Sequence, residues 1–366
     1  MSEKKITVIG CGMVGRLIAT DLGNDYLVTA VDKDANNLDL LNHFRGKKQV
    51  ADALKVDDLK LATKDCDLVL LAVPGFMGFQ VLKNLIQLGK NVVDISFFPE
   101  DANLLNELAL ENNCFAMVDC GIAPGYSHLA PGYYATKGLK NYTCYVGGLP
   151  FEKAPPFAYK APFSPIDVIE EYTRPARFRR DRKDITQPPL TEYEILDFEK
   201  AGVLEAFVSD GLRSLIGSYP DIPDMIEKTL RHPGHAAAIK VLIDGGLLDD
   251  SGPSPTPLEF NSKILFNQWK LMPEDDEFTF MRLLLKGANF SKQIDIYDRK
   301  DFKSGFSSMS RTTGFTACAI ARRAIEENFD LNGIFVPEIL GEKYGYFEFV
   351  TKFLKQKGIT IEEKDL

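Results

Sequence analysis

The chain has 366 residues, enough for two compact domains, because single hydrophobic cores seldom grow past about 250 residues. Hydrophobic residues make up 45% of it and charged residues 26%, which is typical of a globular protein. The net charge of −9 argues against nucleic acid and anionic membranes as partners, since both need a basic face. No uninterrupted apolar run approaches about 18 residues, so no transmembrane span is expected.

The six cysteines are scattered, and no two form a Cys-x-x-Cys pair. This pattern favours reduced thiols over a disulfide framework. A strand-like run begins at Lys5, which leaves no room for a signal peptide. We therefore expect a cytoplasmic protein.

Short apolar runs alternate with amphipathic stretches over residues 1–125. Strands are predicted at 5–9, 27–31, 67–73, 91–94 and 115–118, and helices at 13–22, about 35–44 and 76–88. This alternation is typical of an α/β fold, a doubly wound parallel sheet covered by helices. The first domain is therefore predicted to be a Rossmann-type domain.

The pattern changes beyond residue 125. Strands of a mixed or antiparallel sheet are predicted at 142–146, 278–286 and 293–297, with proline-rich connections between them. Residues 126–310 are therefore predicted to form an α+β substrate and dimerisation domain. A strong amphipathic helix over 313–328 and a polar tail follow. We expect residues 311–366 to return to the first domain.

A Gly-x-Gly-x-x-Gly sequence follows the first predicted strand and opens a helix. In dinucleotide-binding folds the first glycine permits a tight turn, the second admits the pyrophosphate, and the third lets helix and strand approach. Asp32 ends the second strand, 22 residues after Gly10, where a carboxylate binds ribose hydroxyls and repels a 2′-phosphate. Lys33 is its only neighbouring cation, so NAD is predicted over NADP. The cofactor-binding residues predicted here are Gly10, Gly12, Met13, Val14, Gly15 and Asp32.

Later strand ends supply further candidates for cofactor contacts. Ligands of open α/β sheets bind at the carboxyl edge, and four residues follow strands that end there. These are Val73, Pro74, Asp94 and Ser96. The alternative is that they form ordinary strand-to-helix turns.

Residues 119–127 form the most unusual local sequence, Asp-Cys-Gly-Ile-Ala-Pro-Gly-Tyr-Ser. Two glycines and a proline after a buried strand predict a constrained turn. The turn lies where the first predicted domain gives way to the second, so Pro124 and Gly125 are added to the cofactor-binding set.

This turn resembles that of the saccharopine dehydrogenase-like proteins, and among them the lysine 6-dehydrogenases. The resemblance continues collinearly over nearly the whole chain, through 145–150, 171–176, 204–207, 228–235 and 309–313. It implies a Rossmann domain completed by C-terminal helices around an α+β catalytic and dimerisation domain, and hence a homodimer. Residues 249–275 have no clear counterpart.

The resemblance also implies a reaction at a CH–NH2 group. A lysine 6-dehydrogenase passes hydride from the ε-carbon of L-lysine to NAD; water then releases ammonia, and the semialdehyde cyclises to piperideine-6-carboxylate. One alternative is a secondary-amine enzyme, such as saccharopine reductase or a carboxynorspermidine dehydrogenase. Another is an NAD-binding sensor without turnover.

Such chemistry needs a base and charges that match an amino acid. The catalytic candidates are Asp119, Cys120 and His235. Each has a structural alternative: Asp119 could accept from N–H groups of the turn, Cys120 could be a packing residue, and His235 could begin a helix. Arginine suits a carboxylate because its fork binds two oxygens. The predicted substrate-binding residues are Tyr126, Tyr172, Thr173, Arg174, Arg231 and Arg311. No metal is expected, since Pro-Gly separates His232 from His235 and no third ligand accompanies them.

Overall fold

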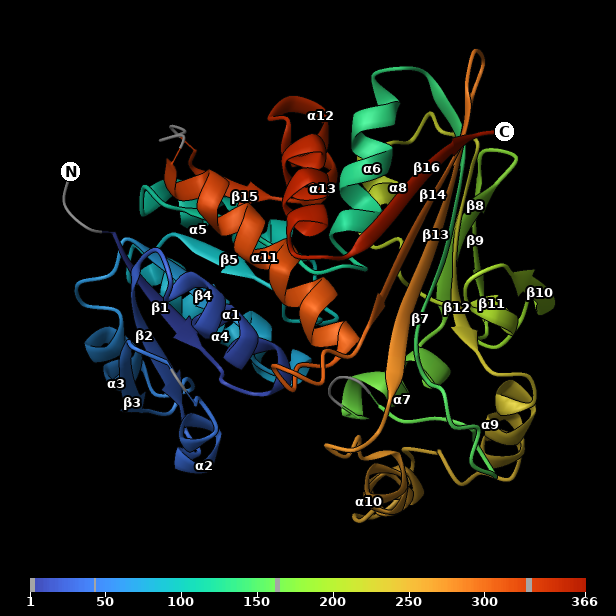
Figure 1. Cartoon of the computed structure of the whole chain (residues 1–366), viewed down its shortest axis with the longest axis horizontal. Coiled ribbons are helices and arrows are strands. Elements are labelled where there is room, and N and C mark those ends of the chain that lie inside the picture. The colour runs from blue at the N-terminus through green and yellow to red at the C-terminus, as the bar shows by residue number, and fades with distance from the viewer. Residues whose placement is uncertain (1–3, 43, 162–164, 327–330) are drawn as a thin grey trace. The chain divides into compact units, whose positions relative to one another are not determined.

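The computed structural model describes residues 4–42, 44–161, 165–326 and 331–366. The chain forms two compact units. Unit 1 comprises residues 1–133 and 310–358, and unit 2 comprises residues 134–309 and 359–366. Figure 1 shows the elements of both units.

In its described residues, unit 1 contains a seven-stranded parallel sheet with the order β15-β6-β5-β4-β1-β2-β3. The strands are β1 (Lys5–Ile9), β2 (Leu27–Asp32), β3 (Lys47–Val50), β4 (Leu68–Leu71), β5 (Val92–Asp94), β6 (Phe115–Met117) and β15 (Gly333–Phe335). All four residues of β4 are buried, as a central parallel strand requires. The chain order reverses between β1 and β4, where sheets of this kind bind ligands. The predicted doubly wound sheet is confirmed.

The helices of unit 1 come from both ends of the chain. They are α1 (Met13–Leu22), α2 (Ala35–Asp39), α3 (Val56–Ala62), α4 (Gly75–Gln87), the 3-10 helix η1 (Ala102–Leu105), α5 (Asn106–Glu111), α6 (Tyr126–Ala135), α11 (Ser308–Glu326), α12 (Pro337–Lys343) and α13 (Tyr346–Gln356). The two ends of α6 and of α11 fall in different units. Residues 310–358, which include the C-terminal helices, belong to unit 1.

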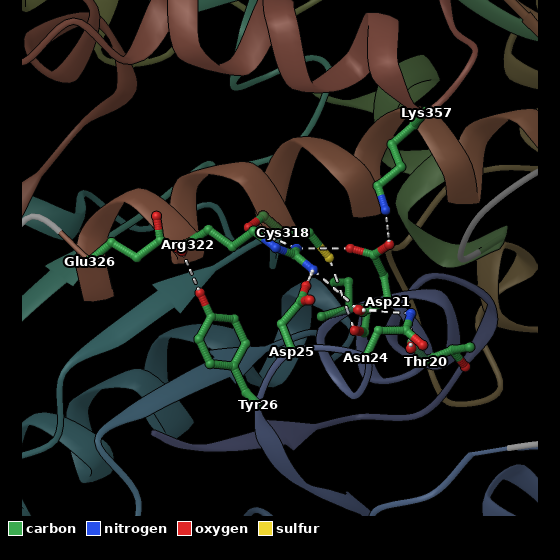
Figure 2. A network of polar contacts seen from close by, with 10 residues as sticks. Thr20, Asp21, Asn24, Asp25, Tyr26, Cys318, Arg322, Glu326 and Lys357 are labelled. Atoms are coloured by element: carbon green, nitrogen blue, oxygen red, sulfur yellow. Dashed lines mark hydrogen bonds and ion pairs between the residues drawn. The ribbon is translucent and has the colours of Figure 1, made fainter. Parts of the chain in front are cut away.

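A network of ion pairs around the buried Asp21 joins α11 to α1 (Figure 2). Arg322 on α11 forms ion pairs with Asp21, at 2.8 Å, and with Asp25, at 2.6 Å. Lys357, which follows α13, forms a second ion pair with Asp21. Because Asp21 is 7% exposed, these two cations balance a carboxylate that water scarcely reaches. Helix α1, which follows the glycine sequence, is thus held by ion pairs with residues more than 300 positions away in the chain.

Unit 2 is built on a mixed sheet of nine strands among its described residues. Seven of them pair in the order β10-β11-β12-β7-β13-β14-β16, with β8 against β12 and β9 against β8. The strands are β7 (Leu139–Pro150), β8 (Ala176–Arg180), β9 (Lys183–Gln187), β10 (Glu194–Phe198), β11 (Gly202–Val208), β12 (Asp224–Arg231), β13 (Glu277–Gly287), β14 (Ser291–Arg299) and β16 (Thr360–Asp365). Its helices are α7 (Pro165–Thr173), α8 (Leu215–Ser218), α9 (His235–Asp244) and α10 (Pro257–Trp269). Within the described part of unit 2, β7 and β12 are the one parallel pair, which confirms the predicted mixed α+β architecture.

Three predicted elements need correction. The tail does not return to unit 1 throughout, because β16 pairs with β14 in the sheet of unit 2. The second helix ends at Asp39 rather than 44, since Leu41 and Asn42 donate to carbonyls only three and two residues back. The helix predicted at 313–328 begins at Ser308, whose N–H donates to the buried carboxylate of Glu277. Its predicted last residues, 327–328, lie outside the described residues.

Candidate functional site

The glycine loop of unit 1 has three glycines with three different surroundings. Gly10 has φ +88°, and a Cβ there would lie 2.3 Å from the carbonyl oxygen of Ala72. A Cβ on Gly15 would lie 1.8 Å from the carbonyl oxygen of Gly10. A Cβ on Gly12 would meet nothing within 4 Å. Gly10 and Gly15 therefore serve backbone packing, whereas Gly12 faces open space in which a ligand can approach the backbone.

The N-terminus of α1 lies beside that open space. Gly12 is its N-cap, no side chain caps it, and its first turn holds no acidic residue. Met13 and Val14 are its first two residues, so their N–H groups have no acceptor within the helix. Uncapped N–H groups and the helix dipole together suit an anion such as a pyrophosphate.

Asp32 ends β2 against the same loop. Its Oδ2 accepts from the backbone N–H of Cys11 at 2.7 Å and from Asn37 Nδ2 at 3.3 Å. Its Oδ1 accepts from the backbone N–H of Asp34 at 2.8 Å. The carboxylate is thus held at the loop from both sides.

The residues that follow β4 and β5 differ in exposure. Val73 is half-buried and Pro74, the N-cap of α4, is exposed. Asp94 and Ser96 are buried, and Asp94 Oδ1 accepts from the N–H of Ser96 at 2.8 Å. Asp94 therefore closes the turn after its own strand, which was the structural alternative considered for it.

The turn after β6 is compact. Gly121 forms a bridge with Gly125, and a Cβ on Gly125, which has φ +132°, would lie 1.8 Å from the carbonyl oxygen of Gly121. The bond between Ala123 and Pro124 is cis. Asp119 is 5% exposed with φ +55°, and Cys120 is fully buried. Cys120 N–H donates to the carbonyl of Asp94 at 2.9 Å, which joins this turn to the end of β5.

Burial raises the pKa of the Cys120 thiol well above its usual range, and the neighbouring carboxylates Asp94 and Asp119 raise it further. The thiol is therefore neutral at physiological pH. A neutral, enclosed thiol is neither a base nor a nucleophile. This geometry favours the packing alternative for Cys120 over the catalytic one.

Tyr126 is buried rather than open to a ligand. Its hydroxyl lies 2.8 Å from Thr351 Oγ1 on α13, and its ring centroid lies 5.6 Å from that of Phe347. This differs from the expectation that Tyr126 contacts substrate, because the side chain is already committed to α13. The Tyr126 side chain therefore supports the turn through its contacts with α13.

In unit 2 three of the predicted residues form one buried chain of hydrogen bonds. Arg231 Nε donates to the Tyr172 hydroxyl at 3.0 Å, and that hydroxyl lies 2.9 Å from His235 Nε2. His235 Nδ1 lies 2.8 Å from the carbonyl oxygen of Phe157, which can only accept. The proton therefore sits on Nδ1, and Tyr172 donates to Nε2.

Burial, and then the charge of Arg231, lower the pKa of His235 to about 3. An imidazole of that pKa is a weak base at neutral pH. His235 also begins α9, and the carboxylate of Glu205 accepts from the backbone N–H groups of Gly234 and Ala236. These observations favour the helix-start alternative for His235.

The remaining substrate-binding candidates each have contacts within their own unit. Thr173 is exposed at the end of α7, and its hydroxyl donates to the carbonyl of Ile169. Arg174 forms an ion pair with Glu170 in the preceding turn. Arg311 belongs to unit 1, where it donates to the carbonyl of Lys357 at 3.1 Å.

The sequence of unit 1 matches the model of the saccharopine dehydrogenase NADP binding domain over residues 6–117. Residues 121–359 match the model of the saccharopine dehydrogenase C-terminal domain. The chain belongs to the saccharopine dehydrogenase family. The resemblance seen in the sequence is thus confirmed at the level of the family.

Two curated relatives carry the same name. The chain is 26% identical over 277 residues to the saccharopine dehydrogenase [NADP(+), L-glutamate-forming] of Pyricularia oryzae and 25% identical over 270 residues to that of Saccharomyces cerevisiae. Each alignment covers 68% of this chain and 59% of the relative. The chain therefore matches less than two thirds of these relatives.

A solved saccharopine dehydrogenase structure has the same fold. The apo enzyme (L-Glu forming) from Saccharomyces cerevisiae superposes with a TM-score of 0.82 at 18% identity, covering 99% of this chain and all of the other. The two proteins therefore share their fold.

Two side chains that contact Arg231 in this saccharopine dehydrogenase-family chain were not predicted from the sequence. Glu171 accepts from Arg231 at 2.5 Å, and the Arg231 guanidinium lies 4.5 Å from the ring centroid of Tyr159. Glu171 directly precedes Tyr172 in the family-like segment, but no periodicity indicates which arginine it meets. Among the described residues, no cluster of His, Cys, Asp and Glu is arranged to hold a metal ion, and no helix is long and apolar enough to span a membrane.

Proposed function

We propose that this chain is a nicotinamide-dependent oxidoreductase that acts on a carbon–nitrogen bond of an amino acid. The observation that carries the proposal is that both family models match in order along the chain, with the glycine loop intact in the first. The open space at Gly12 and the uncapped start of α1 fit a dinucleotide pyrophosphate. When bound, the cofactor supplies the hydride acceptor.

We propose L-lysine as the substrate, oxidised at its ε-carbon. Saccharopine, the alternative that the names of the relatives favour, carries three carboxylates and needs more cationic anchors than lysine. In unit 2 the arginines Arg174 and Arg231 already pair with Glu170 and Glu171. Their neutralised charges support a substrate with a single carboxylate.

In this proposal Asp119 is the residue that meets the substrate amine. It lies at the carboxyl edge of the parallel sheet, within the turn that the family resemblance singled out. Its carboxylate would pair with the ammonium group and take a proton as the carbon loses hydride. Water then adds to the resulting imine, ammonia leaves, and the semialdehyde cyclises.

We further propose that NAD is preferred over NADP. The family model and the relatives are named for NADP, whereas Asp32 places a carboxylate beside the loop with Asp34 two residues on. Two acidic side chains at this position oppose a 2′-phosphate and suit a free ribose diol. NADP is therefore supported by the names of the family model and the relatives, whereas NAD is supported by the negative charge beside the loop.

We also propose a homodimer. Tyr193, Ile195 and Val203 expose 50%, 55% and 47% of their surface around the β10 edge of the unit 2 sheet. An exposed apolar edge favours association with another chain. Sedimentation equilibrium would test this, and a monomer at micromolar concentration would contradict it.

The experiment for the activity follows absorbance at 340 nm with NAD and with NADP across lysine, ornithine, saccharopine and polyamines. Signal with lysine and NAD is the expected result. Signal with saccharopine alone would retain the reaction class and overturn the substrate. Dinucleotide binding without turnover of any amine would instead support a sensor.

A further inference from the structure

Arg16 lies one turn inside α1, directly after the glycine loop. Its Nε donates to the carbonyl oxygen of Gly12 at 3.2 Å, and the residue is half-buried. Side chains on a helix point back toward its N-terminus and cover the preceding turn. The guanidinium therefore lies over the first turn of α1, whose N-cap is Gly12.

Several other arginines of the described residues have carboxylate partners. Arg179 pairs with Asp184, Arg231 with Glu171, Arg282 with Asp295, and Arg322 with Asp21 and Asp25. Arg16 forms no ion pair with any described residue, and its one described side-chain hydrogen bond is to Gly12. A half-buried guanidinium held by a single carbonyl retains donors for an anion from outside the chain.

The surroundings of Cys11 show that Arg16 lies close to the loop itself. Burial and then the charge of Asp32 raise the pKa of the Cys11 thiol, while the charge of Arg16 lowers it, and together these effects bring the pKa to about 12. One carboxylate and one guanidinium thus flank the same short loop. The carboxylate suits hydroxyls, and the guanidinium suits phosphate.

We propose that Arg16 is a cofactor-binding residue whose guanidinium binds a phosphate group of the dinucleotide beside Gly12. The proposal rests on the dinucleotide binding proposed above and adds a residue to it. Arginine binds phosphate oxygens through two parallel N–H groups, which a lysine or glutamine cannot reproduce. The pyrophosphate and the 2′-phosphate of NADP offer the same chemistry.

The test is a titration of the full chain with NADH, NADPH, ADP-ribose and adenosine, comparing Arg16→Gln with the wild type. Because a charged hydrogen bond is lost, the affinity for the phosphate-bearing ligands should fall by about tenfold or more. The affinity for adenosine should not change. An equal loss for NADH and NADPH assigns the pyrophosphate. A loss confined to NADPH assigns the 2′-phosphate.

Arg16→Lys should recover part of the affinity, because it restores charge without the fork. Lys60→Gln is the matched control, since it removes one positive charge from exposed α3 of the same unit. The proposal is overturned if the Arg16→Gln variant keeps the wild-type melting temperature and binds every ligand with wild-type affinity. Wild-type protein that binds no dinucleotide would instead overturn the proposed function.

Discussion

The backbone N–H of Cys11 lies 2.7 Å from Oδ2 of Asp32. This contact links the glycine loop to the end of β2, so the residue proposed to select the cofactor also holds the loop that receives it. A change at Asp32 therefore reports on ribose recognition and on loop geometry together.

Asp32→Ala is expected to weaken NAD binding by more than about tenfold, because a charged acceptor for the ribose hydroxyls is lost. The loss for NADP should be smaller, since the 2′-phosphate is no longer repelled. Isothermal titration with both cofactors measures this. Asp39→Ala, at the exposed end of α2, removes the same charge and should change neither affinity. Unchanged NAD affinity in Asp32→Ala would contradict the assigned role.

Asp21→Asn is expected to destabilise unit 1 by about 3 kcal/mol, because it leaves buried Arg322 and half-buried Lys357 without their shared carboxylate. Chemical denaturation measures the change. Asp244→Asn breaks an exposed helical ion pair with Lys240 and should cost less than about 0.5 kcal/mol. Equal effects of the two substitutions would show that the network in Figure 2 contributes no more than a surface pair.

Glu227 on β12 is 5% exposed, and burial raises its pKa from 4.5 to about 8. The folded state therefore binds one more proton than the unfolded state between pH 4.5 and about 8. Its contribution to stability is complete below pH 4.5 and is lost as pH rises through about 8, at about 1.4 kcal/mol per pH unit.

Glu227→Gln should remove this slope, so that the variant matches the wild type near pH 5 and exceeds it in stability near pH 8. Urea denaturation at several pH values measures the slope. Glu199→Gln, at a side chain that is 82% exposed, is the control and should keep the wild-type slope. A slope that survives in Glu227→Gln would assign the proton uptake to another group.

His235 is expected to remain neutral from pH 5 to 8, with its proton on Nδ1, because its pKa is lowered to about 3 and both ring nitrogens have partners. Nitrogen-15 NMR of histidine-labelled protein distinguishes the tautomers, and His235→Asn assigns the signal. Titration of that signal near pH 6.5 would restore His235 as a candidate base.

The parallel sheet of unit 1 could be predicted because its apolar strands and glycine loop are local signals. The strand β15 could not, since Gly333–Phe335 is short and acquires its place only by pairing with β6, far away in sequence. The tail was misassigned for the same reason: the six residues of β16 are mostly polar, and their pairing with β14 is a tertiary fact.

The site was predictable where a residue's role follows from its own backbone. Gly10, Gly12 and Gly15 have the surroundings expected of them because each role depends on nearby chain. Tyr126 and His235 were read as polar lining and base, but whether a ring faces a ligand or Thr351 depends on what packs against it. The sequence shows which side chains could bind a ligand or a proton. It does not show which of them already have a hydrogen-bond partner within the protein.

The division of unit 1 between two distant stretches of chain bears on its biosynthesis. During translation residues 1–133 emerge first, yet Asp21 meets Arg322 and Lys357, and β6 meets β15, only when residues 322–357 have been made. The sheet of unit 2 likewise gains β16 last. A ribosome-bound nascent chain would therefore carry two unfinished units, each with an exposed strand edge, until residues 310–365 have been made.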